Sequence, residues 1–247
     1  MKNKRAALPN FFTLANSFLG FLSILYASDG RFLAAAWCIT FATICDSLDG
    51  KLARLSKTSS KFGVQLDSLS DIISFGVAPA FLVYATNFAS FGIWGAFLSF
   101  LFIFAGIFRL ARFNVTTSLK KKSDFKGLPI PVAALAIATF FVFTNNYFGT
   151  VHMPPVIASM VIALSALMVS NVEYKTIPSL RLFRDFKKNI LPVSYIIGYT
   201  VILFTRGVLF FPFVLMYIAV YFIKWVFPKY NIVEDEPDYS VDEENIV

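Results

Sequence analysis

The stretch Asp46–Asp71 reads DSLDGKLARLSKTSSKFGVQLDSLSD and contains four aspartates in a chain that is 57% apolar. Asp46 and Asp49 are three residues apart, and Asp67 and Asp71 are four residues apart. At either spacing, two side chains project from the same face of a helix. The pattern therefore predicts two helices, each presenting a pair of carboxylates, and the two pairs can converge on one site.

The sequence around this stretch has the composition of a membrane protein. Only 15% of its 247 residues are charged, and a helix needs ~20 apolar residues to cross a hydrocarbon core of ~30 Å. Polar turns at residues 86–92, 145–146 and 153–155 divide the longer apolar runs. We expect eight membrane spans, at residues 11–28, 32–50, 62–85, 90–112, 130–148, 155–172, 189–205 and 207–226.

Basic residues are distributed unevenly between the two sides of these spans. If the amino terminus is cytoplasmic, 20 of the 22 Lys and Arg residues lie in cytoplasmic segments, and only Arg31 and Arg206 lie outside. This predicts a multi-pass protein of the cell (inner) membrane, with both termini and the four aspartates on the cytoplasmic side. The net charge of +7 follows from this orientation and from contact with anionic lipid. No nucleic-acid-binding motif accompanies it, so we expect no nucleic-acid partner.

Four carboxylates close together repel one another unless cations share the space. Oxygen ligands of this kind suit Mg²⁺ or Mn²⁺, which also take phosphate oxygens as ligands. Acids in membrane-spanning helices are costly and usually functional, which favours a metal site. The alternative is a structural cluster of ion pairs with the neighbouring residues Lys51, Arg54, Lys57 and Lys61.

Eight positions in this stretch fit the pattern DxxDGxxARx8GxxxDxxxD without a mismatch, and through them the chain resembles the CDP-alcohol phosphotransferases (CDP-alcohol phosphatidyltransferases, class I). Such a long fixed pattern seldom matches by chance. The resemblance covers the first six expected spans, so it implies a six-helix catalytic core within an all-α integral membrane protein of about eight transmembrane helices. The matching positions are Asp46, Asp49, Gly50, Ala53, Arg54, Gly63, Asp67 and Asp71.

The resemblance also implies roles for individual residues. The four aspartates would hold two divalent ions, Mg²⁺ or Mn²⁺, against the pyrophosphate of CDP-diacylglycerol, and Asp71 would also take the proton from the attacking hydroxyl. The polar residues Asn10, Thr13 and Asn16 recur every three residues, and polar contacts between helices would explain them as well as contact with a ligand does. Asn10 and Thr13 also match a PNxxT stretch that precedes the motif. The residues expected to bind CDP-diacylglycerol are Asn10, Thr13, Gly50, Ala53, Arg54 and Gly63.

Later segments resemble the branch of the family that transfers the phosphatidyl group to L-serine, with release of CMP. These segments are DSLSDIISFGVAPA at 67–80, RLARFN at 109–114, GLPIP at 127–131 and LMVSNVEY at 167–174. This resemblance implies CDP-diacylglycerol and L-serine as substrates, the lipid bilayer as environment and a homodimer as the assembly.

The RLARFN segment supplies the residues expected to bind serine, which are Arg109, Arg112 and Asn114. The two arginines lie three residues apart at the cytoplasmic end of a span, and a guanidinium can bind a carboxylate through two hydrogen bonds. Contact with lipid headgroups is the simpler alternative for both arginines.

Two other functions stay open on the sequence alone. The acceptor could be another alcohol, such as glycerol 3-phosphate or inositol phosphate. An ion-coupled transporter also needs intramembrane acids, but it would more naturally show inverted repeats and broken helices. The domain organisation is simpler: residues 1–232 form one membrane domain, and residues 233–247 form an acidic tail that we expect to be disordered.

Overall fold

The computed structural model describes residues 2–56, 61–119, 125–174 and 207–227. A π-helix, η1 (Ile72–Val77), follows α3 directly, and a second π-helix (Tyr84–Phe88) and a 3₁₀ turn (Ala89–Phe91) lead from α4 to α5. The short strands β1 (Phe125–Lys126) and β2 (Glu173–Tyr174) pair antiparallel. The α-helices are α1 (Lys2–Ser28), α2 (Phe32–Ser56), α3 (Lys61–Asp71), α4 (Ala78–Val83), α5 (Gly92–Leu119), α6 (Ile130–Phe148), α7 (Pro154–Val169) and α9 (Phe210–Val226).

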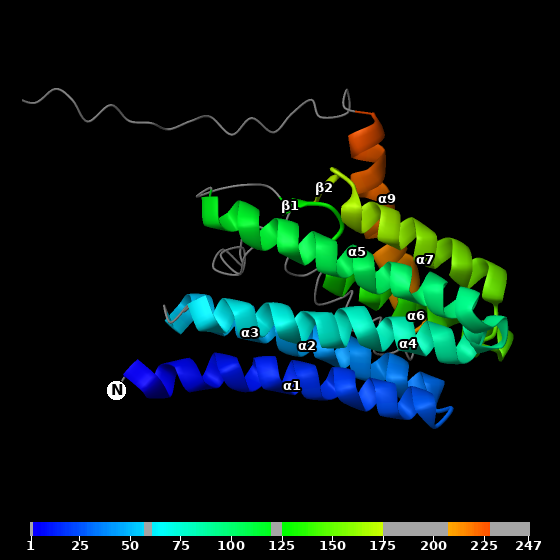
Figure 1. The fold of residues 1–247 in the computed structure, drawn as a ribbon, viewed down its shortest axis with the longest axis horizontal. Helices are drawn as coiled ribbons and strands as arrows, with labels where there is room; N and C mark the ends of the chain where they lie inside the picture. The colour runs from blue at the N-terminus through cyan, green and yellow to red at the C-terminus, as the bar shows by residue number, and fades with distance from the viewer. Residues whose placement is uncertain (1, 57–60, 120–124, 175–206, 228–247) are drawn as a thin grey trace, which may run out of the picture.

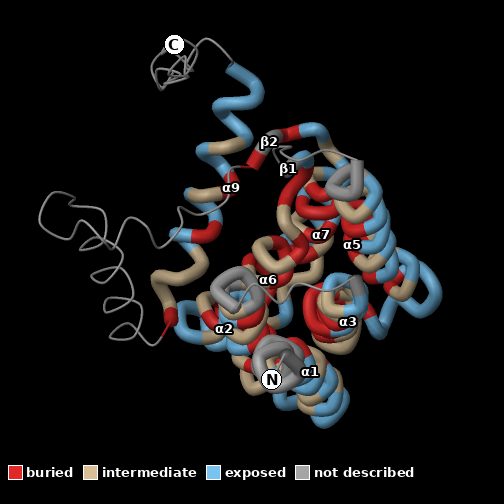
Figure 2. The backbone as a smooth tube through the Cα atoms, turned by 90° about the vertical axis from the view of Figure 1, so that its left-hand side faces the viewer, coloured by how far each residue is buried: buried red, intermediate tan, exposed pale blue. Residues whose placement is uncertain are grey.

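The long helices run alongside one another (Figure 1), and their buried faces point towards the middle of the bundle when it is viewed from one end (Figure 2). α1 packs mainly on α2, α2 also packs on α6, and α5 packs on α7. Small side chains let the helices approach closely. The α1–α2 contact, for example, buries Ala27, Ala35 and Ala36.

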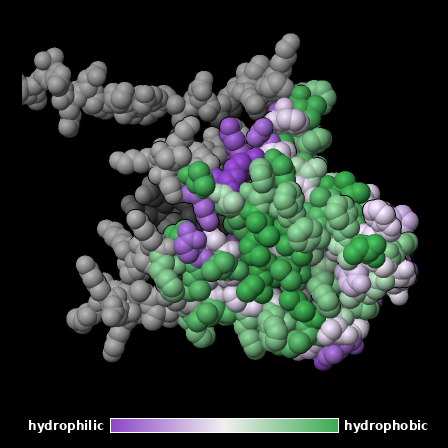
Figure 3. Space-filling view, viewed as in Figure 1, coloured by the Kyte–Doolittle hydropathy of each residue, from purple (hydrophilic) through white to green (hydrophobic). Residues whose placement is uncertain are grey.

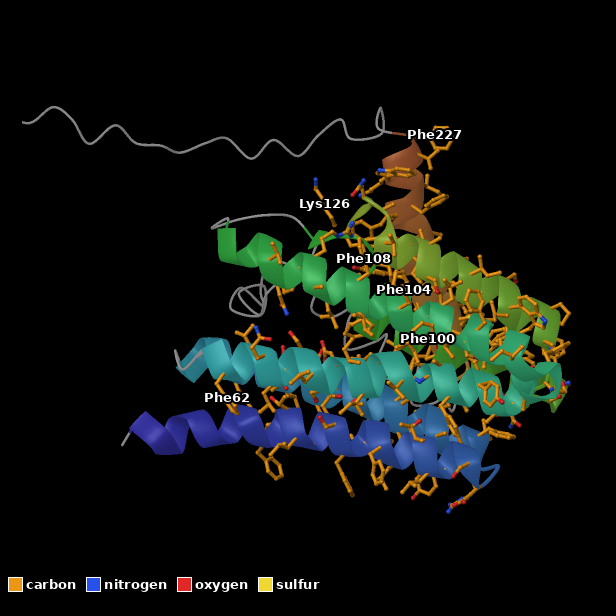
Figure 4. The ribbon with its side chains drawn as sticks, in the orientation of Figure 1. Phe62, Phe100, Phe104, Phe108, Lys126 and Phe227 are labelled. Atoms are coloured by element: carbon orange, nitrogen blue, oxygen red, sulfur yellow. The ribbon has the colours of Figure 1, made fainter. Side chains whose placement is uncertain are left out.

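Apolar side chains also cover much of the outer surface (Figure 3). Phe100 and Phe104 are each 53% exposed, and with Phe108 they form a row along α5 (Figure 4). A continuous apolar surface of this size is stable against hydrocarbon and unfavourable in water. In the described part of the chain, four segments are long and apolar enough to cross a membrane: Phe11–Ser28, Phe32–Gly50, Phe62–Val115 and Ile130–Phe148. The protein is therefore a helical integral membrane protein, as the composition predicted.

Most of the expected spans coincide with helices. The segments at 11–28, 32–50 and 130–148 match three of the apolar segments nearly residue for residue. The expected spans 62–85 and 90–112 both fall in Phe62–Val115, where the chain reverses direction between α4 and α5 (Figure 1). Gly92 begins α5 with a φ of 56°, a conformation that favours glycine, so the polar turn expected at 86–92 is confirmed.

The remaining expected spans are only partly described. The two shorter apolar helices α7 and α9 correspond to the spans expected at 155–172 and 207–226. The span expected at 189–205 and the acidic tail, 233–247, lie outside the described residues. The total of eight spans therefore stays a prediction.

α1 approaches η1 through a glycine. A Cβ atom on Gly20 would lie 2.6 Å from the Cα of Ser74, which is closer than real Cβ contacts come. The Ser74 hydroxyl donates a 2.8 Å hydrogen bond to the backbone carbonyl of Asn16, one turn earlier on α1. Glycine at this position therefore sets the distance between α1 and the segment that follows Asp71.

We expect Gly20→Ala to lower the midpoint of thermal unfolding in detergent. The added methyl group pushes the α1 backbone away from η1, and overpacking of this kind typically costs ~1–3 kcal/mol. Gly76→Ala is the matched control on η1, because a Cβ there would meet its nearest neighbour at an ordinary 3.8 Å. Equal unfolding midpoints for the two variants would contradict the tight contact at Gly20.

Candidate active site

Three of the four motif aspartates come together between α2 and α3. One carboxylate oxygen from each of Asp46, Asp49 and Asp67 lies within 4.8 Å of the other two. Asp49 is buried, and Oδ1 of Asp67 is buried without a hydrogen-bond partner among the described residues. An unpartnered buried oxygen costs ~1–3 kcal/mol, and more when it is charged, unless a ligand binds it. This three-aspartate group therefore fits a divalent cation that prefers oxygen ligands, such as Mg²⁺ or Mn²⁺.

Asp71 lies beside the three-aspartate group. It is the last residue of α3, it is 7% exposed, and its carboxyl group interacts with that of Asp46. Its Oδ1 atom accepts a 3.4 Å hydrogen bond from Nδ2 of Asn16. The chain continues from Asp71 into the π-helix η1, and π-helical turns occur frequently at functional sites.

α1 lines the site with polar side chains. Oγ1 of Thr13 donates a 2.9 Å hydrogen bond to Oδ2 of Asp49, while Asn16 contacts Asp71 one turn further on. Ser17, the residue after Asn16, shares a 2.6 Å hydrogen bond with Ser70, and the Ser70 hydroxyl also donates a 2.8 Å hydrogen bond to the carbonyl of Thr13. The polar residues of α1 therefore connect helices, as one interpretation of their spacing held, and they do so at the acids themselves.

The residues expected around the nucleotide are only partly described. Gly50 follows Asp49, and a Cβ atom on it would meet no atom of the described residues within 4 Å, so these residues leave open space beside that acid. Gly63 is half-buried on α3, one turn before Asp67. Asn10, Ala53 and Arg54 belong to α1 and α2, with side chains outside the described part of the structure.

Arg109 faces the acids from α5. Its side chain is 6% exposed, and its charge interacts with those of Asp71 and Asp46. The guanidinium carbon lies 5.7 Å from the centre of the Phe113 ring, within cation–π distance. Its Nε atom is buried and has no hydrogen-bond partner in the part of the chain that the structure describes. A buried guanidinium with an unused donor can bind a carboxylate or a phosphate.

Arg112 has a different environment, although it is only one turn away. Its guanidinium donates to the carbonyl oxygens of Lys126 at 2.8 Å, Val169 and Ser170 at 3.0 Å, and Met168 at 3.4 Å. Three of these carbonyls belong to the C-terminal end of α7, where they have no partner further along the helix. Arg112 therefore caps α7 and ties it to α5 and β1.

The sequence motifs of the expected acceptor site meet at this junction. Gly127 has a φ of 85°, and a Cβ atom there would collide with the carbonyl oxygen of Met168. Tyr174 of β2 is buried against α9, and burial raises its pKa to about 12, so its hydroxyl stays neutral. Nδ2 of Asn114 donates a 3.1 Å hydrogen bond to Ser68, which links α5 to α3 next to Asp67. Many residues of the RLARFN, GLPIP and LMVSNVEY segments thus join the helices and strands around the site to one another.

Comparison with known proteins identifies the family. Residues 6–172 match the family model for CDP-alcohol phosphatidyltransferases. The chain belongs to this family of membrane-bound transferases, which confirms the resemblance seen in the acidic motif. Membership also removes the ion-coupled transporter as an alternative.

Three of the similar curated proteins come from a bacterium and two archaea. A CDP-diacylglycerol-serine O-phosphatidyltransferase of Helicobacter pylori is 36% identical over 227 residues, which are 91% of this chain and 93% of the relative. An archaetidylserine synthase of Methanothermobacter thermautotrophicus is 41% identical over 170 residues, 68% of this chain and 69% of the relative. A CDP-diacylglycerol-serine O-phosphatidyltransferase of Methanocaldococcus jannaschii is 34% identical over 176 residues, 71% of this chain and 77% of the relative.

Proposed function

We propose that the protein is a CDP-diacylglycerol-serine O-phosphatidyltransferase, which moves the phosphatidyl group of CDP-diacylglycerol to the hydroxyl of L-serine and releases CMP. The three-aspartate group beside a buried arginine is the observation that carries this proposal. Such a site can bind a pyrophosphate through cations and a small carboxylate through the guanidinium. The similarity to serine-transferring relatives over nearly the whole chain points to the same acceptor.

The donor set of the site fits a divalent metal. Asp46, Asp49 and Asp67 offer only oxygen ligands, and we propose that they hold two ions, Mg²⁺ or Mn²⁺. Asp71 would touch one ion as a peripheral fourth ligand, so that the ions stay bound without it. When bound, divalent cations supply charge that stabilises the phosphate of the leaving CMP and makes the phosphorus under attack more electrophilic.

The protein's own residues bind and orient the two substrates. The open space beside Gly50 admits the nucleotide, and Thr13 fixes the Asp49 carboxylate with its hydrogen bond. Arg109 binds the serine carboxylate. Asp71 accepts the proton of the serine hydroxyl while the serine oxygen bonds to the β-phosphorus of CDP-diacylglycerol. The bond between this phosphorus and the CMP oxygen breaks at the same time.

We further propose that the site opens to the cytoplasmic side of the cell (inner) membrane, with both termini on that side, and that the protein is a homodimer. The charge distribution of the loops supports this orientation. The end of α2 that carries the acids lies near the beginning of α1 (Figure 1), and the basic residues Lys2, Lys4 and Arg5 belong to that beginning. The homodimer rests on the family resemblance.

Release of CMP from CDP-diacylglycerol by the purified protein in detergent tests the function. We expect release that depends on L-serine, stops in excess chelator and returns when Mg²⁺ or Mn²⁺ is added. Glycerol 3-phosphate and inositol phosphate, offered in parallel, test the alternative acceptors. Release with either of these in place of serine would assign a different acceptor, and release in excess chelator would exclude the metal.

The two arginines of α5 should respond differently to exchange for lysine. Arg109→Lys should raise the KM for serine by about ten- to a hundredfold, because a charged hydrogen bond contributes ~1.5–3 kcal/mol. Arg112→Lys should leave that KM unchanged and lower the unfolding midpoint, because lysine cannot reach four carbonyl oxygens at once. A higher KM for serine in Arg112→Lys alone would reverse the two roles.

A further inference from the structure

Asn16 is a fully buried amide that contacts one of the acids. It lies on α1 with 0% of its side chain exposed, and its Nδ2 atom is 3.4 Å from Oδ1 of Asp71. This distance is long for a hydrogen bond, and catalytic hydrogen bonds are often long before substrate binds and shorten afterwards. Its Oδ1 atom is buried and has no hydrogen-bond partner within residues 2–56, 61–119, 125–174 and 207–227.

The chemistry of the contact fixes which way the amide points. An ionised carboxylate, the form that can accept the proton of the alcohol, only accepts hydrogen bonds, so the NH₂ group of Asn16 has to face Asp71 and its oxygen has to face away. The oxygen is then left unpaired, which costs free energy in a buried position. An apolar residue of similar shape would avoid that cost. The amide is therefore suited to gripping Asp71 and poorly suited to simple packing.

The backbone around Asn16 is held in place independently of its side chain. Its carbonyl oxygen accepts the hydrogen bond from Ser74 in η1, and the carbonyl of Thr13, one turn earlier, accepts the hydrogen bond from Ser70. Both serines flank Asp71 in sequence. α1 and the segment that carries Asp71 are thus registered against each other on both sides of the amide contact.

Thr13 and Asn16 each donate a hydrogen bond to a different acid of the site. Thr13 donates to Asp49, and Asn16 donates to Asp71, so each of the two most buried acids receives one donor from α1. Asp49 belongs to the three-aspartate group, whereas Asp71 lies beside it. The two contacts therefore act on different parts of the site.

We propose that Asn16 is a positioning residue that holds Oδ1 of Asp71 and thereby directs the other carboxylate oxygen to the hydroxyl of the acceptor alcohol. The proposal rests on the proposed function, because it acts through Asp71 as the proton acceptor. Free rotation of the Asp71 carboxylate would reduce the time that a proton-accepting oxygen spends in hydrogen-bond reach of the substrate. Asn16 itself does not touch the reacting atoms.

The test is a double-mutant cycle on CMP release with wild type, Asn16→Leu, Asp71→Asn and the double variant. In the wild-type background we expect Asn16→Leu to lower kcat by about ten- to a hundredfold, as for other residues that orient a functional side chain. In the Asp71→Asn background the same exchange should lower kcat by no more than about twofold, because its partner is already lost. Mn²⁺ binding, measured by electron paramagnetic resonance, should be retained.

Two further variants separate positioning from folding. Asn16→Asp keeps the shape of the side chain and replaces the donor by an acceptor, so it should lose at least as much activity as Asn16→Leu. Ser23→Ala removes another buried hydrogen bond of α1, the 3.0 Å contact with the carbonyl of Ala35, and should leave kcat unchanged. Full activity of Asn16→Asp, or losses that multiply in the double variant, would overturn the proposal. A wild type without serine-dependent CMP release would instead refute the proposed function.

Discussion

Exchange of Asp67 for asparagine is expected to abolish divalent-cation binding and CMP release together. The two side chains have nearly the same shape, so the variant removes the charge and leaves the packing of α3 intact. Oδ1 of Asp67 is buried without a partner and belongs to the three-aspartate group, which makes it a direct ligand in the proposed site. A bound metal supplies several kcal/mol of charge stabilisation, so the loss of rate should be on the order of 10³-fold or more.

Mn²⁺ binding and CMP release should be measured on the same preparation of Asp67→Asn. Asp29→Asn is the matched control, because Asp29 is an exposed acid in the turn between α1 and α2, at the other end of these helices. It should keep both properties. If Asp67→Asn binds Mn²⁺ as wild type does, Asp67 is not a ligand, and its unpartnered oxygen needs another explanation.

The acidic motif predicted much of this site because helical periodicity is a local property. Spacings of three and four residues place two side chains on one helix face whatever the rest of the chain does. The position of one aspartate pair relative to the other is not a local property. It depends on how α1 packs against α2, α3 and η1, which are contacts between distant parts of the chain. The sequence therefore predicted four ligands, with Asp71 also accepting the proton, but it could not predict that Asp46, Asp49 and Asp67 form one group and that Asp71 lies beside it.

The two arginines of α5 also show that a local sequence pattern does not predict contacts between distant parts of the chain. Their spacing predicted a shared face and a shared role, and both residues do lie on the last turns of α5. Arg112, however, meets the carbonyl groups at the end of α7, more than fifty residues later in the chain. No local pattern reports where those carbonyls lie. Arg109 is buried near the acids, and only the packing of α5 distinguishes it from its neighbour.

The polar residues of α1 were visible in the sequence but ambiguous. Thr13 and Asn16 recur at helical spacing, which indicates a polar face, and a polar face in a membrane helix can contact another helix or a ligand. The structure shows that both residues donate to acids. The feature that distinguishes Asn16, an amide oxygen left unpaired, arises only when the surrounding helices close over it.

The Asp71→Asn variant should retain metal and CDP-diacylglycerol while losing transfer to serine. Serine's hydroxyl is a weak nucleophile until a base within hydrogen-bond reach takes its proton. Asp71 is suited to this role because it lies one turn beyond Asp67 and beside the three-aspartate group, and because Asn16 of α1 donates a hydrogen bond to it. The charge of Arg109 on α5 also interacts with it. Loss of acid–base catalysis typically lowers the rate by ~10²–10⁴-fold.

Binding and turnover have to be measured separately on Asp71→Asn to distinguish a base from a ligand. If Asp71 acts as the base, Asp71→Asn lowers kcat but leaves the Mn²⁺ affinity and the KM for CDP-diacylglycerol close to wild type, because the interaction is made only as the hydroxyl reacts. If Asp71 is instead an essential metal ligand, Asp71→Asn lowers the Mn²⁺ affinity and kcat together, as expected for Asp67→Asn. Should Asp71→Asn follow that second pattern, Asp71 completes the metal site, and the proton of serine must leave through another acceptor.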